Sequence, residues 1–228
     1  MKLLIVKLTI FLNLKRGNKQ FMKKKYITLL NYPGSKKRLI EFIVSNVTKY
    51  VPEGSRVMDI FSGTSAIGYA LKDGYSVVAN DSEEFCRVIG EALLHKTTYT
   101  FDDKNKELFM QFFEENSNLL KSAYLLAADE KKLIEAKDIA GLVKFYKQTL
   151  LNVWQEGFIE PSCASKYKLF CNYYSNSYFG LNQSIEIDSI RYAIDQVGSN
   201  KSMLLASLFY AMKEGVFSKD GHMAQPLN

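Results

Sequence analysis

The sequence predicts an α/β fold in which one Rossmann-like βαβ unit is followed by a mainly helical insertion. The first observation behind this prediction is residues 57–81, VMDIFSGTSAIGYALKDGYSVVAND, which have the pattern strand, turn, helix, strand. The second is residues 104–156, where apolar residues recur at helical spacing almost throughout. The third is the absence of a fixed-period repeat or a low-complexity segment, which argues against a solenoid or a fibrous chain.

Each part of the βαβ unit carries its own signal. The first strand contains Asp59 near its end, and a turn of small residues around Gly63 follows it. A helix over residues 67–71 and a second strand over residues 75–79 then lead to Asp81. Glycine lets the backbone approach a ligand closely, and the start of a helix presents free N–H groups to an anion. An acid at the end of the second strand can accept hydrogen bonds from two ribose hydroxyls.

The turn indicates which class of ligand this unit holds. The dinucleotide fingerprint GxGxxG is absent, because DIFSGTSAIG has one glycine at the turn, a serine at the next glycine place and Gly68 inside the helix. A pyrophosphate fits such a turn poorly, and a ligand with a smaller anionic end fits it better. S-adenosylmethionine is such a ligand, with a carboxylate at one end, a ribose and an adenine. The alternative is a buried strand and a tight turn that hold no ligand.

Composition is that of an ordinary globular protein. The 228 residues are 47% hydrophobic and 24% charged, enough for a substantial core in one large domain or in one and a half smaller ones. Three cysteines without CxxC spacing and two histidines predict neither a disulfide framework nor a metal site. A reducing cytoplasm is therefore the expected compartment. The apolar run in residues 1–14 is broken by Lys7 and is too short to cross a membrane.

The basic charge of the chain is concentrated at its N-terminal end. The net charge is +6, and residues 1–40 contain eleven lysines and arginines and no acidic residue. Such a one-signed segment favours a polyanionic partner such as nucleic acid, and the alternative is a solvated basic tail. We expect residues 1–25 to be a basic extension outside the fold, with Met22 as a natural start.

The remaining elements follow from periodicity and turn chemistry. The expected elements are a short strand over residues 26–30, a helix over 36–49, a helix that begins near Phe85, the helical stretch 104–156, and helices over 185–197 and 203–212.

Residues 161–180 change character. Tyrosines and phenylalanines alternate there with lysine, asparagine and serine side chains. Aromatic rings among basic and amide groups suit stacking on bases and contacts to phosphate. The candidate DNA-contacting residues are Lys166, Lys168, Tyr173, Tyr174 and Asn176. The alternative is a loop whose aromatic rings pack back onto the helices.

Four stretches together resemble the Dam-like family of adenine-specific DNA methyltransferases. NYPGSK resembles the first cofactor motif of the family, and DIFSGTSAIG resembles its Asp-x-Phe-x-Gly-x-Gly loop with Ser65 at the last loop glycine. Asn80 and Asp81 resemble the ribose-binding end of the second strand. YFGLNQSIEIDSIRYAI and GHMAQPL resemble the target-recognition region and the segment after it. The resemblance runs from about residue 26 to the C-terminus.

The resemblance implies roles for individual residues. Lys36 would pair with the carboxylate of S-adenosylmethionine, Asp59 would lie near its amino group, and Asp81 would hold the ribose hydroxyls. The full set of implied cofactor-binding residues is Tyr32, Gly34, Lys36, Asp59, Phe61, Ser62, Gly63 and Asp81. A family member transfers the methyl group to the exocyclic amino group of adenine in duplex DNA, after flipping that base out of the helix. A bacterial or phage-encoded restriction-modification system is the implied setting.

The resemblance also implies a division of the chain. Residues 26–84 would form the cofactor-binding methyltransferase core, residues 85–200 a helical subdomain that recognises the DNA target, and residues 201–228 a segment that returns to the core. At Ser65 the resemblance implies weaker cofactor binding if the backbone there must adopt a positive φ, which glycine tolerates best.

One motif of the family is missing. The catalytic Asp-Pro-Pro-Tyr tetrapeptide does not occur, because the four prolines of the chain are never adjacent. We therefore expect an incomplete core, and the sequence offers no catalytic residue. One hypothesis is an adenine methyltransferase that needs a second polypeptide to supply the motif. The alternatives are an inactive or split fragment that binds S-adenosylmethionine or DNA, and a small-molecule methyltransferase or nucleotide-binding protein.

Overall fold

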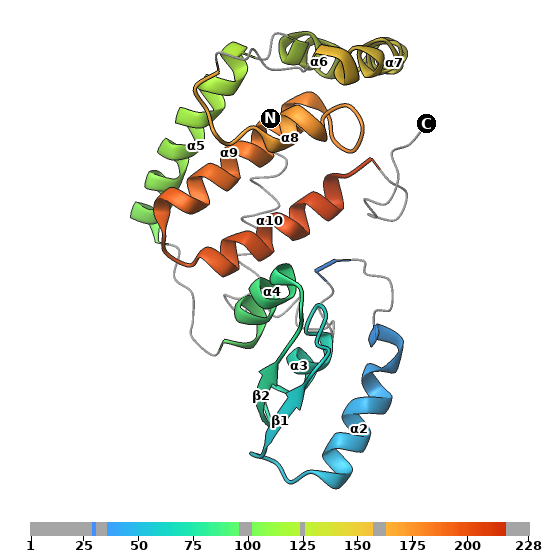
Figure 1. The fold of residues 1–228 in the computed structure, drawn as a ribbon, viewed down its shortest axis with the longest axis vertical. Coiled ribbons are helices and arrows are strands. Elements are labelled where there is room, and N and C mark those ends of the chain that lie inside the picture. Colours follow the sequence, from blue (N-terminus) through green and yellow to red (C-terminus); the bar gives the residue numbers. More distant parts are fainter. Residues whose placement is uncertain (1–28, 31–35, 96–101, 124–125, 157–162, 218–228) are drawn as a thin grey trace. The chain divides into compact units, whose positions relative to one another are not determined.

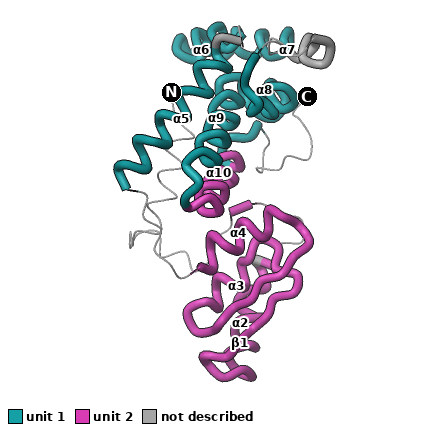
Figure 2. The backbone as a smooth tube through the Cα atoms, turned by 60° about the vertical axis from the view of Figure 1, so that its left-hand side comes forward, with its two compact units in different colours: residues 1–5, 101–199, 214–228 teal, residues 6–100, 200–213 magenta. Residues whose placement is uncertain are grey.

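The structure is a computed structural model that describes residues 29–30, 36–95, 102–123, 126–156 and 163–217. The chain divides into two compact units, which are coloured separately in Figure 2. Among the described residues, unit 2 takes residues 29–95 and 200–213, and unit 1 takes residues 102–199 and 214–217. No helix in the described ranges is long and apolar enough to span a bilayer.

Unit 2 contains the predicted βαβ unit. Strands β1 (Arg56–Asp59) and β2 (Ser76–Ala79) run parallel, and helix α3 (Ala66–Leu71) connects them (Figure 1). The register pairs Asp59 with Ala79, so both strands end at the same edge of the sheet. The predicted strand-turn-helix-strand order is confirmed, with boundaries shifted by one or two residues.

A larger Rossmann-like sheet is not seen in the described residues. The sheet there has two strands, and the rest of the described structure is mostly helical. Only the βαβ part of the predicted core is therefore confirmed. Leu29 and Leu30, which end the strand predicted over residues 26–30, lie in a bend and not in a strand, and residues 26–28 are outside the described ranges.

One side of unit 2 is built on the helix predicted over residues 36–49. It consists of a 3₁₀ turn, η1 (Lys36–Leu39), followed by α2 (Ile40–Tyr50). The buried residues of this side are Ile40, Ala66, Ile67, Leu71 and Tyr75. Because these come from α2, α3 and the start of β2, their packing holds the connecting helix against the sheet.

The other core of unit 2 joins segments that are far apart in the sequence. Helix α4 (Glu84–Leu94) contributes Ile89 and Leu93, and helix α10 (Lys201–Gly215) contributes Met203 and Ala206. Leu29 is completely buried in the same cluster. The boundary of unit 2 lies near residue 100, because the apolar face of α4 packs within the core of the βαβ unit.

Unit 1 is helical in its described part. The long helices α5 (Asp103–Ala123) and α9 (Leu181–Val197) lie against each other (Figure 1). Three further helices complete the unit: α6 (Leu126–Glu135), α7 (Ile139–Glu156) and α8 (Leu169–Tyr173). Residues from α5, α6, α8 and α9 share one core, which confirms the predicted helical block.

A buried carboxylate anchors the start of α9. Glu130, which is 1% exposed, accepts hydrogen bonds from the N–H groups of Leu181 (2.7 Å) and Asn182 (2.8 Å). It also accepts one from the hydroxyl of Tyr146 (2.7 Å). A Cβ at Gly180 would lie 2.7 Å from the Glu130 carboxylate, so only glycine allows this approach. The negative charge at a helix N-terminus satisfies donors that otherwise lack partners.

We predict that Glu130→Ala destabilises unit 1 by about 3 kcal/mol, because it leaves several buried donors without an acceptor. The measurement is urea unfolding followed by circular dichroism. Glu135→Ala on the same helix is the control, since its ion pair with Lys131 is exposed and is worth less than about 1 kcal/mol. Equal losses in both variants would contradict the anchoring role.

Candidate functional site

The carboxyl ends of β1 and β2 are tied together by the backbone. The Asn80 N–H donates to the Asp59 carbonyl (2.9 Å), and the Ser62 N–H donates to the Asn80 carbonyl (3.0 Å). The side-chain amide of Asn80 also donates to the Ile60 carbonyl (3.1 Å). These bonds extend the pairing beyond the last strand residues and bring the turn after β1 beside the end of β2.

The turn itself is open on one side. Gly63 has a φ of +50°, and a Cβ built on it would meet no described residue within 4 Å. The turn closes when the Ser65 N–H donates to the Ser62 carbonyl (2.8 Å). Open space over a glycine backbone lets a ligand approach the main chain, as predicted for this position.

Asp81 is the acid that this turn holds. Its Oδ2 accepts from the Gly63 N–H (2.8 Å), and its Oδ1 accepts from the Glu83 N–H (3.2 Å). The bond from Gly63, followed by that from Glu83, lowers the pKa of Asp81 below its ordinary value. The carboxylate is therefore ionised at neutral pH and keeps lone pairs for further donors.

Lys36 and Asp59, which were predicted to act near each other, form an ion pair. The Lys36 Nζ lies 3.2 Å from Asp59 Oδ1, and it also donates to the Phe61 carbonyl. The second carboxylate oxygen, Asp59 Oδ2, is buried and has no hydrogen-bond partner in the described part of the chain. A buried acceptor without a donor costs free energy, so this oxygen is suited to a donor from a ligand.

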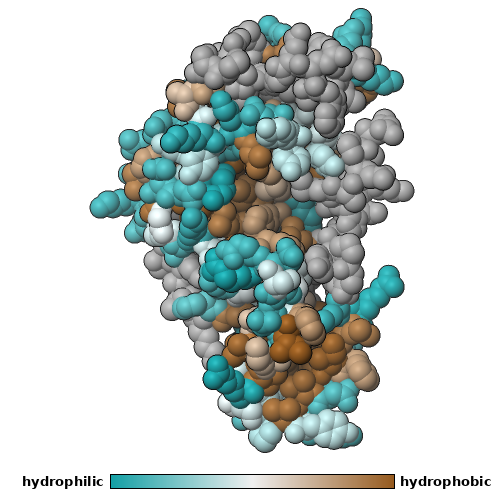
Figure 3. Space-filling view, in the orientation of Figure 1, coloured by the Kyte–Doolittle hydropathy of each residue, from teal (hydrophilic) through white to brown (hydrophobic). Residues whose placement is uncertain are grey.

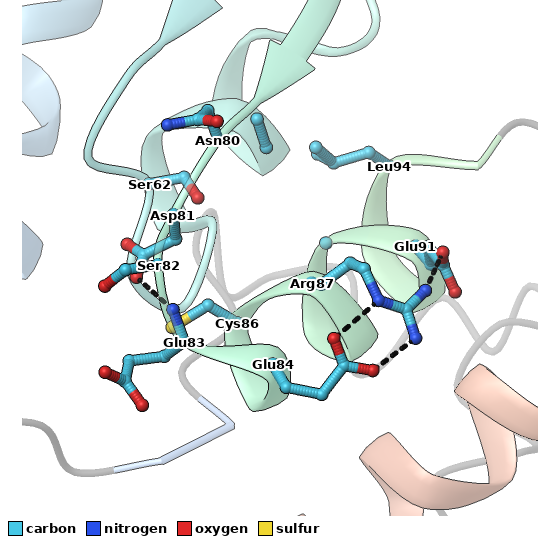
Figure 4. A pocket seen from close by; sticks show the side chains of 12 residues that line it. Ser62, Asn80, Asp81, Ser82, Glu83, Glu84, Cys86, Arg87, Glu91 and Leu94 are labelled. Atoms are coloured by element: carbon cyan, nitrogen blue, oxygen red, sulfur yellow. Dashed lines mark hydrogen bonds and ion pairs between the residues drawn. The ribbon is translucent and has the colours of Figure 1, made fainter.

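A cavity of about 470 Å³ opens beside Asp81 (Figure 4). Its charged lining consists of four carboxylates and one guanidinium. Arg87 pairs with Glu84 (2.5 Å) and with Glu91, and these contacts raise the pKa of Arg87. Burial, with a further contribution from Asp81, raises the pKa of Cys86 to about 12, so its thiol stays protonated. The lining residues are Ser62, Ala79, Asn80, Asp81, Ser82, Glu83, Glu84, Cys86, Arg87, Gly90, Glu91 and Leu94.

The contribution of α4 to this cavity was not predicted from the sequence, because the helix after Asp81 was expected to belong to the recognition subdomain. The signal was present, because Glu84, Arg87, Glu91 and Leu94 are spaced three or four residues apart and share one helix face. A helix that directly follows the acid at the end of β2 brings such a face to the same edge of the sheet.

The other predicted cofactor residues differ in exposure, and two of them lie outside the described residues. Ser62 is buried and lines the cavity, whereas the Phe61 side chain is 75% exposed. Tyr32 and Gly34 lie outside the described residues. No group of three or more potential metal-ligating side chains occurs within the described ranges.

The predicted DNA-contacting residues differ in exposure. Lys166 is exposed and Tyr173 is 68% exposed, so both can reach a partner. Lys168 donates to the Cys163 carbonyl (3.2 Å), and Tyr174 packs against neighbouring rings. Asn176 is buried, and its amide donates to the Tyr146 carbonyl (3.0 Å). That internal use favours a structural role for Asn176 over the predicted contact to DNA.

Comparison with known proteins gives two matches. Residues 32–219 match the model of a family described as D12 class N6 adenine-specific DNA methyltransferase. The chain is also similar to a protein named Modification methylase LlaI from Lactococcus lactis subsp. lactis, with 36% identity over 74 residues. That match covers 32% of this chain and 12% of the relative, so the chain corresponds to only a small part of that protein. No solved structure matches the chain.

We predict that the Gly63 amide signal titrates with Asp81 at a pH below the ordinary aspartate pKa of about 3.9, as measured by NMR. Because the folded pKa is lowered, ionised Asp81 stabilises the fold above about pH 4, and this contribution is lost as the pH falls through the folded value. Asp81→Asn abolishes the titration and Asp73→Asn does not. A midpoint above the ordinary value would contradict the Gly63 contact.

Proposed function

Because the chain belongs to the D12 class N6 adenine-specific DNA methyltransferase family, we propose that it binds S-adenosylmethionine at the carboxyl ends of β1 and β2 and serves the methylation of adenine in duplex DNA. The observation that carries this proposal is the hydrogen bond from the Gly63 N–H to Asp81, which couples the glycine turn to the acid of the second strand. When bound, the cofactor supplies an electrophilic methyl group on a sulfonium centre.

The amino-acid end of S-adenosylmethionine fits the Lys36–Asp59 pair. The buried Asp59 Oδ2, which has no donor among the described residues, suits the ammonium group. Lys36, the cation of the pair, suits the carboxylate. The zwitterionic end of the ligand and this ion pair are thus complementary in charge.

The nucleoside end fits Asp81 and the cavity beside it. The Asp81 carboxylate accepts two backbone N–H bonds and retains lone pairs for two ribose hydroxyls. The cavity lining carries four carboxylates against one guanidinium, which repels phosphate groups. This charge favours a cationic sulfonium ligand over a nucleoside phosphate or a dinucleotide, and so disfavours the nucleotide-binding alternative.

We propose DNA contact for four residues of the 163–180 segment, of which Lys166 and Tyr173 are exposed and Lys168 and Tyr174 are half-buried. Lys166 and Lys168 would contact phosphate, and Tyr173 and Tyr174 would stack on bases. Tyr173 is the best placed of these because its ring is 68% exposed. The segment is held in place by Asp188, which accepts from the N–H groups of Phe170 (3.1 Å) and Cys171 (2.9 Å). A rigid base for an exposed ring lowers the entropy cost of binding.

Methyl transfer requires groups that this sequence does not contain. The family's Asp-Pro-Pro-Tyr tetrapeptide is absent from the 228 residues. Within the described ranges, β1 pairs on one edge with β2, and large apolar side chains are exposed on unit 2 (Figure 3). These side chains are Leu39, Phe42, Met58, Ile60 and Phe61. A parallel sheet is normally covered on both faces, and we propose that a second polypeptide completes the sheet and supplies the tetrapeptide.

The alternative function is binding without catalysis, by a split or inactive chain. The similarity to a protein named a modification methylase supports a setting in restriction and modification for either form. One experiment distinguishes the two functions, because cofactor binding and methyl transfer are measured independently.

We predict that the purified chain binds S-adenosylmethionine in isothermal titration calorimetry but transfers no labelled methyl group to adenine in mixed-sequence duplex DNA. Asp81→Ala weakens cofactor binding by about tenfold or more, since it removes a charged acceptor. Asp73→Ala, at an exposed position of the same unit, is the matched control. Adding a polypeptide that carries Asp-Pro-Pro-Tyr restores transfer.

Two results would overturn this account. Methylation of adenine by the chain alone would show that another residue replaces the tetrapeptide. Absence of cofactor binding would show that the site at the ends of β1 and β2 does not serve S-adenosylmethionine.

We predict that Tyr173→Ala weakens duplex DNA binding by about tenfold, the loss expected when one stacked base loses its aromatic partner. Fluorescence anisotropy with a labelled duplex measures this. Tyr50→Ala is the matched control because its ring is exposed to a similar degree, 70% against 68%. Equal affinities for the Tyr173 variant and the parent chain would exclude stacking by this residue.

A further inference from the structure

Ser65 adopts a backbone conformation that side chains disfavour. It precedes α3 with a φ of 56° and a ψ of 28°, in the left-handed region, and it is completely buried. The family loop that this stretch resembles has a glycine at this position. A serine keeps a left-handed backbone conformation only when contacts with its surroundings hold it in that conformation.

The Ser65 side chain lies close to Gly90 of α4. A Cβ built on Gly90 would lie 3.3 Å from Ser65 Oγ and 3.8 Å from the Cβ of Ala79. The Ser65 hydroxyl is buried and forms no hydrogen bond within the described residues. Its contribution at this point is therefore steric contact with α4 and not a polar interaction.

The backbone of Ser65 is connected to the candidate site. Its N–H closes the turn on the Ser62 carbonyl (2.8 Å), and its carbonyl accepts the first helical bond from the Tyr69 N–H (2.8 Å). Within the same turn, the Gly63 N–H holds Asp81 (2.8 Å). A shift of Ser65 away from α4 would move this turn, and the Gly63 N–H with it.

We propose that Ser65 and Gly90 form a matched pair that positions the turn 62–65 for the cofactor. In this pair the serine hydroxymethyl group packs closely against Gly90, where no side chain stands, and sets the distance between the turn and α4. The glycine of the pair lies on α4 and the larger residue lies on the turn. Gly90 also lines the cavity beside Asp81, so the pair acts on both sides of the site.

Ser65 and Gly90 are thus positioning residues that act through Gly63 and Asp81. The effect on ligand affinity rests on the proposed function, whereas the steric coupling between the two residues does not. This difference lets one experiment test the two parts separately.

The test is a double-mutant cycle with Gly90→Ala, Ser65→Ala and the double variant. Ser65→Ala keeps a Cβ in the left-handed conformation and removes only the Oγ that faces Gly90. The readouts are the Kd for S-adenosylmethionine by calorimetry and the Tm by circular dichroism. Gly68→Ala, alone and with Ser65→Ala, is the matched control, because its Cβ would meet Val77 (3.1 Å) and Leu94 (3.2 Å) and not Ser65.

The expected result is a coupling confined to the pair. Gly90→Ala raises the Kd by about tenfold in the parent chain and by less than about twofold in the Ser65→Ala background, within the range of coupling between residues in contact. In that background it also raises the Tm by about 2 °C, because alanine is the better helix former once space is free. The Gly68→Ala effects are the same in both backgrounds.

Other outcomes overturn the proposal. Additive effects of Gly90→Ala and Ser65→Ala on Kd and Tm would show that the two residues are not matched. Rescue of Gly90→Ala by Ser65→Gly but not by Ser65→Ala would show that backbone strain, and not side-chain contact, is responsible. Coupling in Tm with an unchanged Kd would reduce the pair to packing. If neither the parent chain nor any variant binds the cofactor, the proposed function fails. The double-mutant cycle on Tm then decides by itself whether the two residues are coupled.

Discussion

The hydrogen bond from the Gly63 N–H to Asp81 is the contact on which the candidate site depends. It spans 2.8 Å and joins the turn after β1 to the first acid after β2. It requires the positive φ of Gly63 and the parallel register that ends both strands at one edge. The bond in turn lowers the pKa of Asp81 and so favours the ionised carboxylate.

The two units solve a similar physical problem with buried polar groups. In unit 2, Lys36 and Asp59 pair at the end of β1 and leave one buried oxygen for a donor. In unit 1, Glu130 is saturated by N–H and hydroxyl donors, and burial raises the pKa of Asp188, which accepts from two backbone N–H groups. Glu130 serves the structure of unit 1, whereas we propose that the unsatisfied Asp59 oxygen of unit 2 receives a donor from a ligand.

The described part of the chain contains a βαβ unit and a helical unit. A two-stranded parallel sheet with exposed apolar neighbours is a marginal arrangement in water, and the family's catalytic tetrapeptide is not in the sequence. We propose that the cofactor is nevertheless held at the edge of this sheet, so that binding and catalysis are separable in this chain.

The sequence by itself determined the elements and the three residues at their ends. Apolar periodicity located β1, β2 and nearly every helix, because that signal is local, and the order of acid, glycine and acid between residues 59 and 81 predicted Asp59, Gly63 and Asp81 as site residues. Tertiary structure alone decided that α4 lines the cavity, that Asn176 points into the interior and that Ser65 rests against Gly90. Those features depend on tertiary packing: Ser65 and Gly90 are 25 residues apart, Asn176 and Tyr146 are 30 apart, and the face of α4 reaches the cavity only because that helix packs into the core of unit 2.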